Sequence, residues 1–325
     1  MNFEQRYLQY KALVDRYLVD AIQQTKPQSL YRPLKYVLAG SGKRIRPVLV
    51  LLCCEVVGGK SEQALHASVG IEILHNFTLV HDDIMDNADA RRGRPTVHTR
   101  WDSNTAILVG DELLALAYHI LLRTSSRRIS EIANVFTDGV IEVCEGQAYD
   151  KEFETRASVS VDDYLLMIRK KTGKMVAVST EIGGLIGHAT ADELSALRSY
   201  GELVGRAFQV QDDLLDVIGD EKKFGKTIGG DLKEGKKTYL LLEALRRARG
   251  EDKKLLKTLI RNRGVAKGKV RQFRRIFDTT GAIEAARVFV QHDIAQAKME
   301  LEKLKPSAAR DMLYWFTDML LHRTY

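Results

Sequence analysis

Hydrophobic residues recur along this chain at three- and four-residue spacing, which is the period of an amphipathic α-helix. The N-terminal segment is typical, with apolar side chains at Leu8, Tyr10, Leu13, Val14, Tyr17 and Leu18. Two other segments, 71–80 and 106–122, are apolar nearly all round, which predicts helices that are buried on every side. No run alternates polar and apolar residues over a useful length, so strands are not expected. The pattern predicts an all-α protein.

Glycine and proline mark the expected breaks between these helices. No proline occurs between Pro95 and Pro306, so a long region lacks the strongest helix breaker. The glycines of segment 40–42 precede Pro47, which is expected in the first turn of a helix. Gly93 and Pro95 are expected to end the helix that begins near the apolar segment 71–80.

Composition is that of a globular protein: 45% of the 325 residues are hydrophobic and 29% are charged, which excludes a disordered chain. Without linkers or low-complexity segments, residues 1–325 are expected to form a single domain, a large helix bundle with its site in the core. Cys53, Cys54 and Cys144 have neither disulfide nor metal-ligand spacing, so a reducing cytoplasmic setting is expected. The charged N-terminus is unlike a signal peptide, and the longest apolar run, 48–54, is too short to cross a bilayer.

The formal charge of +7 makes nucleic acids, membrane surfaces and small polyanions candidate partners. Much of the excess lies between Arg246 and Arg275, where basic residues alternate with apolar ones, as on a solvated helix face. Because only one aromatic residue, Phe273, stands among these basic residues and no recognised motif occurs, nucleic-acid binding is not expected.

Two aspartate clusters of the same design interrupt apolar, helix-forming sequence: DDIMD, beginning at Asp82, and DDLLD, beginning at Asp212. On a helix, Asp82 would share a face with Asp86, and Asp212 with Asp216. Carboxylates so close together repel one another and are costly to desolvate, unless cations bind them. Since the clusters lack cysteine and histidine, Mg²⁺ is the expected metal, joining carboxylates to substrate phosphates. Either cluster alone could equally be a solvated acidic face.

Basic residues lie near these clusters. GKRIRP at 42–47 places three cations in a glycine-flanked turn before a helix, where guanidinium groups and the helix dipole can attract an anion. Arg91 and Arg92 follow the first cluster, and His75 lies two helical turns before Asp82. Each has an ordinary alternative, as a surface cation or a buried core histidine.

In this order the motifs resemble those of the trans-polyprenyl diphosphate synthases, the family of farnesyl and geranylgeranyl diphosphate synthases. The resemblance covers nearly the whole chain, and its most specific stretches are GKRIRP (42–47), HDDIMDNADARRGRPTVH (81–98), KTG (171–173), FQVQDDLLD (208–216) and GKTIGGDLKEGKKT (225–238). It implies the isoprenoid synthase fold, an all-α bundle and usually a homodimer, with both aspartate motifs facing a deep central cavity. One departure, Tyr239-Leu240 in place of the proline found in many members, concerns no catalytic residue.

The resemblance also implies a role for each matching residue. Asp82 and Asp86 would bind two Mg²⁺ ions and Asp212 a third, with supporting roles for Asp83, Asp213 and Asp216. The allylic diphosphate would be held by these ions and by Arg91, Lys171, Lys226 and Lys236. Thr172 and Gln209 would line the reacting centre. The diphosphate of isopentenyl diphosphate would be held by Lys43, Arg46, His75 and Arg92.

The implied reaction is head-to-tail addition of isopentenyl diphosphate to allylic diphosphates, with all-trans geranylgeranyl diphosphate as the expected end point. In the family, the residues five and four before the first motif, here Phe77 and Thr78, form the floor that limits product length. The single large Phe77, without an insertion in DDIMD, resembles geranylgeranyl-forming members. On a straight helix, however, Phe77 lies about 140° from Asp82 and Thr78 about 40°. Phe77 could therefore face a neighbouring helix, and farnesyl or longer products stay open.

Two rival interpretations remain. A class I terpene cyclase shares one aspartate-rich motif, but usually carries a different second motif and needs no site for a second diphosphate. A non-catalytic regulatory subunit commonly lacks one acidic motif, whereas this chain has both. Whether the positive surface keeps the protein near membranes that accept a greasy product is left open by the sequence.

Overall fold

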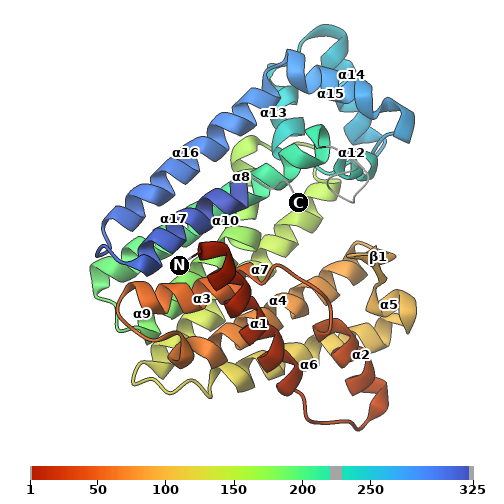
Figure 1. The fold of residues 1–325 in the computed structure, drawn as a ribbon. Helices are drawn as coiled ribbons and strands as arrows, with labels where there is room; N and C mark the ends of the chain where they lie inside the picture. The colour runs from red at the N-terminus through yellow and green to blue at the C-terminus, as the bar shows by residue number, and fades with distance from the viewer. Residues whose placement is uncertain (1, 220–228, 322–325) are drawn as a thin grey trace. The chain divides into compact units, whose positions relative to one another are not determined.

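The computed structural model describes residues 2–219 and 229–321, and these are almost entirely helical (Figure 1). The predicted all-α class is confirmed. Contacts divide the described residues into two compact units. Unit 1 holds the residues up to Thr137 together with Val178–Leu197 and Leu304–Met312, and unit 2 holds Asp138–Ala177, Arg198–Lys303 and the residues from Leu313 onward. The expectation of a single domain stays a prediction.

The elements of unit 1 are α1 (Phe3–Asp20), α2 (Gln28–Leu38), α3 (Ile45–Val56), the 3₁₀-helix η1 (Ser61–Ala64), α4 (Leu65–Met85), β1 (Ala90–Arg91), β2 (Arg94–Pro95), α5 (Val97–Arg100) and α6 (Ser103–Leu121). Those of unit 2 are α8 (Val161–Ile168), the π-helix η2 (Arg169–Gly173), α12 (Gly230–Glu234), α13 (Tyr239–Arg247), α14 (Gly250–Arg261), the 3₁₀-helix η3 (Lys267–Lys269), α15 (Val270–Thr279) and α16 (Ala282–Glu302). Four helices have residues in both units: α7 (Ile129–Thr155), α9 (Lys174–Ile186), α10 (Ala191–Ile218) and α17 (Ala308–Leu321).

The helix α4 is the central element of unit 1 and packs along α6 (Figure 1). Its apolar segment 71–80 is buried on most sides, as predicted. Gly70 allows the close approach, because a methyl group there would lie 3.0 Å from the carbonyl oxygen of Ala117. The prediction of a fully buried helix was wrong for 106–122, since Ile107 and Leu108 are exposed on one side of α6.

The end of α4 differs from the prediction that placed it at Gly93 and Pro95. The helix ends at Met85, and Asn87 follows in the left-handed conformation with φ 48°. The N–H of Asn87 donates to the carbonyl of Ile84 (3.2 Å), and that of Ala88 to the carbonyl of Asp83 (3.0 Å), which makes a Schellman ending. Asparagine tolerates this conformation, so Asn87 ends the helix before the chain reaches Gly93 and Pro95.

A two-stranded hairpin, which the sequence pattern did not predict, follows this ending. Arg91 pairs with Arg94, and the turn residues Arg92 and Gly93 both have positive φ, 51° and 73°. Two consecutive positive φ angles are typical of the tight turns that match the twist of a hairpin. Each strand is only two residues long, so no alternating pattern could reveal it.

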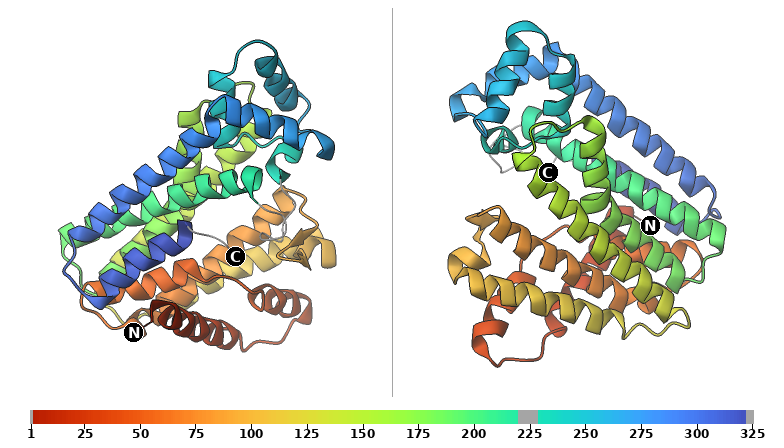
Figure 2. Two further views of the ribbon diagram at one scale, coloured as in Figure 1. Left: turned by 45° about the horizontal axis from the view of Figure 1, so that its top comes forward. Right: turned by 180° about the vertical axis from the view of Figure 1, so that it is seen from behind.

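In unit 2, α13 packs against α14, α15 and α16 (Figure 2). The helix α15 buries Phe273 and Phe277 and exposes Arg271, Arg274 and Arg275. The predicted solvated basic face is therefore confirmed for this helix. Within the described residues, no helix combines the length and the apolar character needed to cross a bilayer.

Candidate active site

The first aspartate cluster lies at the C-terminal end of α4, where Asp86 is the C-cap residue. The N–H of Asp86 donates to the carbonyl of Asp82 (2.9 Å), so the expected i, i+4 relation holds. The last turn contains no basic residue. Carboxylates at the negative end of a helix dipole are unfavourable, and a bound cation would relieve this cost.

The middle residue of this cluster, Asp83, is engaged within the protein. Asp83 is 6% exposed, and its carboxylate accepts a hydrogen bond from Nε of Arg91 at 2.6 Å. Burial raises the pKa of Asp83, while the charge of Arg91 lowers it. The contact fixes Arg91 beside the cluster, which suits a supporting role for Asp83.

The second cluster occupies the last two turns of α10, again at the negative end of a long helix. Asp213 is 4% exposed and accepts hydrogen bonds from the hydroxyl of Tyr164, the amide of Gln209 (3.1 Å) and the backbone N–H of Tyr239 (3.3 Å). Asp216 accepts from the backbone N–H groups of Gly230 and Asp231, both at 3.1 Å. Asp213 and Asp216 therefore connect α10, through hydrogen bonds, to Gly230, Asp231 and Tyr239, which follow it in the chain.

Oxygen-only ligands fit a hard divalent cation. Among residues 2–219 and 229–321, no three carboxylate, imidazole or thiol side chains are grouped so that they could hold a metal ion by themselves. Mg²⁺ does not require such a group, since it usually keeps several waters and joins one or two carboxylates to substrate phosphates. Asp82 with Asp86, at one helix end, matches that demand.

Three of the residues predicted to bind isopentenyl diphosphate are brought together in unit 1. Nη1 of Arg46 lies 3.3 Å from Nε2 of His75, and Arg92 donates to the carbonyl of Ser41 in the turn before α3. Since a guanidinium can only donate, Nε2 accepts, and Nδ1 carries the histidine proton. Burial, followed by the charge of Arg46, lowers the pKa of His75 well below its usual value, so this imidazole is neutral.

The fourth residue, Lys43, is exposed and lies in the same turn. Its carbonyl accepts a hydrogen bond from the hydroxyl of Tyr7 in α1. The turn is therefore anchored through its backbone.

The residues predicted to contact the allylic substrate form connected pairs in unit 2. Lys171 donates to Asp150 at 2.7 Å, and the hydroxyl of Thr172 donates to Gln209 at 3.1 Å. Lys236 forms an exposed ion pair with Glu234 at 3.0 Å. Lys226 lies outside the described residues.

The two residues predicted to limit product length differ in their surroundings. Phe77 is 7% exposed, and its ring packs edge-on against His81 with centroids 4.8 Å apart. His81 in turn meets Gly110 of α6. Phe77 therefore shares the α6 side of α4, while Thr78 is only partly buried and bonds to the carbonyl of His75 (2.8 Å).

Comparison with known proteins identifies the family. The family model described as polyprenyl synthetase matches residues 27–277. The chain belongs to the polyprenyl synthetase family. It is accordingly a trans-prenyltransferase.

Relatives of this polyprenyl synthetase span its full length. A short chain isoprenyl diphosphate synthase of Methanothermobacter thermautotrophicus is 38% identical, covering 97% of each chain. A geranylgeranyl pyrophosphate synthase of Geoglobus acetivorans is 39% identical, over 96% of this chain and 97% of the relative. A geranylfarnesyl diphosphate synthase of Natronomonas pharaonis is 33% identical, over 100% of this chain and 98% of the relative.

Solved structures resemble the synthetase equally well. Geranylgeranyl pyrophosphate synthetase from Pyrococcus horikoshii has a TM-score of 0.94 and 35% identity, covering 99% of this chain and 98% of its own. A polyprenyl synthase from Caulobacter crescentus, complexed with calcium and isoprenyl diphosphate, has a TM-score of 0.90 and 26% identity. The match covers 99% of this chain and 97% of the Caulobacter chain. The isoprenoid synthase fold is confirmed.

Several polar residues at these motifs were missed by sequence reasoning. Arg44 lies inside GKRIRP but is 5% exposed, and it bonds to Asp15 (2.6 Å), Glu72 (2.7 Å) and the carbonyl of Gly40 (2.8 Å). Its neighbours in the motif concealed it, because three cations within four positions do not indicate which one turns inward. Asp150, the partner of Lys171, lies in a helix that also carries Glu142, Glu145, Glu152 and Glu154, so no local signal distinguished it.

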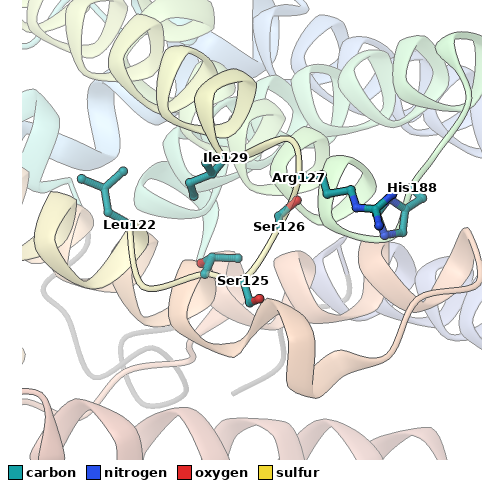
Figure 3. Close-up of a pocket in the computed structure, with 7 residues that line it drawn as sticks. Leu122, Ser125, Ser126, Arg127, Ile129 and His188 are labelled. Carbon is teal, nitrogen blue, oxygen red and sulfur yellow. The ribbon is translucent and has the colours of Figure 1, made fainter.

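A pocket of about 670 Å³ opens elsewhere in unit 1, around the loop between α6 and α7 (Figure 3). It is lined by Leu122, Thr124, Ser125, Ser126, Arg127, Ile129 and His188. None of these is a predicted site residue of the synthetase.

Proposed function

We propose that this polyprenyl synthetase adds isopentenyl diphosphate head-to-tail to allylic diphosphates and ends at all-trans geranylgeranyl diphosphate. The names of the archaeal relatives support this product, since two of the proteins described above make geranylgeranyl chains by name. A farnesyl or a longer product is the alternative, and the geranylfarnesyl relative supports the longer one.

The observation that carries the proposal is the basic group formed in unit 1 by Arg46, His75 and Arg92 around the turn that holds Lys43. An enzyme that only ionises one prenyl diphosphate needs a single diphosphate site. A second group of donors, apart from the residues paired with the acidic motifs, fits an enzyme with two diphosphate substrates. This supports a synthase over a terpene cyclase.

Asp82, Asp86 and Asp212 are the proposed ligands of Mg²⁺, with three ions expected, and Asp83, Asp213 and Asp216 the supporting acids. A divalent cation suits the family, as the calcium complex of the Caulobacter relative indicates for that protein. When bound, Mg²⁺ neutralises the diphosphate and makes it a better leaving group. Asp83 contributes by holding Arg91, and Asp213 by holding Gln209.

The protein's own side chains then act by binding and orientation. Arg91, Lys171, Lys236 and Lys226 hold the allylic diphosphate while negative charge develops on it. Lys43, Arg46, His75 and Arg92 hold the second diphosphate, which orients the double bond toward the allylic carbon. Neutral His75 contributes a hydrogen-bond donor at Nδ1. The diphosphate released in the first step is the proposed acceptor of the proton lost from the new chain.

Three further properties belong to this proposal. A homodimer is supported by Ile107 and Leu108, exposed apolar residues on α6. A cytoplasmic setting is supported by the free cysteines, Cys53, Cys54 and Cys144. Proximity to an anionic membrane surface is supported by the basic face of α15. Nucleic-acid binding is not proposed, because the sequence carries no recognised motif for it.

The deciding experiment is incubation of the purified chain with Mg²⁺, isopentenyl diphosphate and five-, ten- or fifteen-carbon allylic primers, with product length read by chromatography. We expect a twenty-carbon product from every primer. Turnover of the allylic substrate without isopentenyl diphosphate would favour a cyclase. No turnover by the single chain would favour a regulatory subunit.

A further inference from the structure

The segment that carries Lys171 and Thr172 has an unusual backbone. Between α8 and α9 the chain forms the π-helix η2, in which the N–H of Lys174 donates to the carbonyl of Arg169, five residues back. Such single π-turns are rare and often occur at functional sites, because the wider turn re-aims the side chains that it carries. Something in the fold has to hold η2 in this geometry.

Two glycines press against η2 from separate helices. A methyl group on Gly146 of α7 would lie 2.8 Å from the Cα of Lys171 and 2.9 Å from the carbonyl carbon of Lys170. A methyl group on Gly205 of α10 would lie 2.7 Å from the Cα of Gly173. These neighbours are backbone atoms, which cannot rotate away. Glycine is a poor residue for a helix interior, so its presence in two long helices at this place requires a reason.

Each glycine precedes a binding partner of η2 by one helical turn. Four residues after Gly146, Asp150 accepts from Lys171 at 2.7 Å. Four residues after Gly205, Gln209 accepts from Thr172 at 3.1 Å. Residues four apart lie on the same face of a helix. In α7 and in α10, the face that approaches the backbone of η2 therefore also carries the side chain that binds it.

We propose that Gly146 and Gly205 are positioning residues of the synthetase, which together form a clamp that holds η2 so that Lys171 and Thr172 reach the allylic diphosphate. This inference rests on the proposed role of Lys171 and Thr172. Widening either contact by one methyl group displaces η2 from Asp150 or from Gln209. The displacement impairs binding and reaction of the allylic substrate, while the residues that hold isopentenyl diphosphate in unit 1 are left as they are.

The test compares Gly146→Ala and Gly205→Ala with two control glycines. In Gly183→Ala the methyl group would lie 2.8 Å from the Cβ of Cys53, an equally tight contact that does not involve η2. In Gly268→Ala nothing lies within 4 Å of the methyl group. Both clamp variants should raise KM for the allylic diphosphate about tenfold or more and lower kcat, because displacements of about 1 Å impair catalysis strongly. KM for isopentenyl diphosphate should stay within about twofold of the original value in both clamp variants, and Gly183→Ala should lower the free energy of unfolding without changing the allylic KM.

Equal increases in both KM values, or an unchanged allylic KM in a folded clamp variant, would overturn the clamp. Lys171→Ala separates this outcome from failure of the proposed function. If Lys171→Ala leaves the allylic KM unchanged, the role of Lys171 is wrong; if it raises that KM while the glycine variants do not, only the clamp is wrong.

Because an added methyl group can also prevent folding, hydrogen exchange of the unmodified chain provides a second measurement. A clamped η2 should keep the amide of Lys174 protected to the same degree as the amides in the middle of α10. Exchange of Lys174 about a hundredfold faster than those amides would show that η2 opens locally, which would also overturn the proposal.

Discussion

At the scale of single residues, the six aspartates of the two motifs are of different kinds. Asp83, Asp213 and Asp216 accept hydrogen bonds from named groups of the protein, and two of them are almost fully buried. Asp82 and Asp86 lie at a helix end that disfavours negative charge. Substitutions should therefore separate loss of activity from loss of stability.

Asp82→Asn should lower turnover at least about a hundredfold, because Asp82 is a proposed ligand of Mg²⁺ and asparagine lacks its charge. Asp213→Ala should lower the free energy of unfolding by about 3 kcal/mol, because Tyr164, Gln209 and the N–H of Tyr239 lose their common acceptor. Steady-state kinetics and urea unfolding measure the two effects. Near-normal turnover of Asp82→Asn would remove this residue from the metal site.

Arg44 is the residue whose position the sequence left most open. Arg44→Lys keeps the charge but loses the fork that reaches Asp15, Glu72 and Gly40 together, so we expect a loss of about 2 kcal/mol in stability. The loosened turn should raise KM for isopentenyl diphosphate about tenfold and leave the allylic KM unchanged.

Arg6→Lys is the matched control for Arg44→Lys. Arg6 joins α1 to Glu55 of α3 at 2.5 Å without touching the turn. An equal rise of KM for isopentenyl diphosphate in Arg6→Lys would show that weakening any contact of α1 has this effect. Arg44 would then have no specific role in positioning the turn.

At the scale of elements, the junction of α10 with α12 should make stability depend on pH. Burial raises the pKa of Asp213 and of Asp231 above that of an unfolded aspartate, and for Asp231 the charges of Asp213 and Asp216 raise it further. The folded state therefore holds protons that the unfolded state releases. Its stability contribution is complete below about pH 3.9, the unfolded value, and is lost as the pH rises through the elevated pKa values of the folded state.

Without divalent cations, the free energy of unfolding should accordingly fall from pH 5 toward pH 8. Asp231→Asn removes one of these ionisations, so its curve should be flatter over the same range. Urea unfolding at fixed ionic strength in the presence of a chelator measures both curves. If the free energy of unfolding fell with pH by the same amount in Asp231→Asn and in the original protein, the pKa of Asp231 would not differ between the folded and unfolded states.

Whether Phe77 limits product length depends on the side of α4 on which its ring lies. Phe77→Ser should lengthen the product by at least one isoprene unit if Phe77 forms the floor of the cavity, and Phe77→Leu should change it less. Because Phe77 packs on His81 at the α6 side, the alternative is a purely structural role. An unchanged product, together with a stability loss of about 3 kcal/mol, would support that alternative. Chromatography of the products, with thermal unfolding of each variant, distinguishes the two.

At the scale of the whole molecule, the exposed side of α6 bears on assembly. Leu108 is 60% exposed beside Ile107, an arrangement that favours a subunit contact. Leu108→Asp should convert a dimer into monomers, because a buried unpaired carboxylate is costly. Leu8→Asp on α1, where Leu8 is 52% exposed, is the control and should leave the mass unchanged. Light scattering after gel filtration measures the mass, and a dimer that persists in Leu108→Asp would place the contact elsewhere.

Much of this molecule was predictable because helices and acidic motifs are local features. Apolar periodicity predicted the helix α1, the apolar segment 71–80 predicted the buried helix α4, and the spacing of Asp82 and Asp86 predicted their i, i+4 relation. The order of the basic and acidic motifs indicated the family. Periodicity and motif spacing depend on residues within a few positions of one another, and the order of the motifs can be read directly along the chain, so the sequence by itself determined these features.

The tertiary structure decided which member of each motif is engaged. Tyr164 reaches Asp213 from 49 residues away, and Glu72 turns Arg44 inward from 28 residues away. The hairpin at Arg92, the π-helix at Lys171 and the exposed side of α6 likewise have no periodic signal of their own. Each depends on contacts between segments distant in the sequence, and the energy of such contacts exists only once the helices have packed.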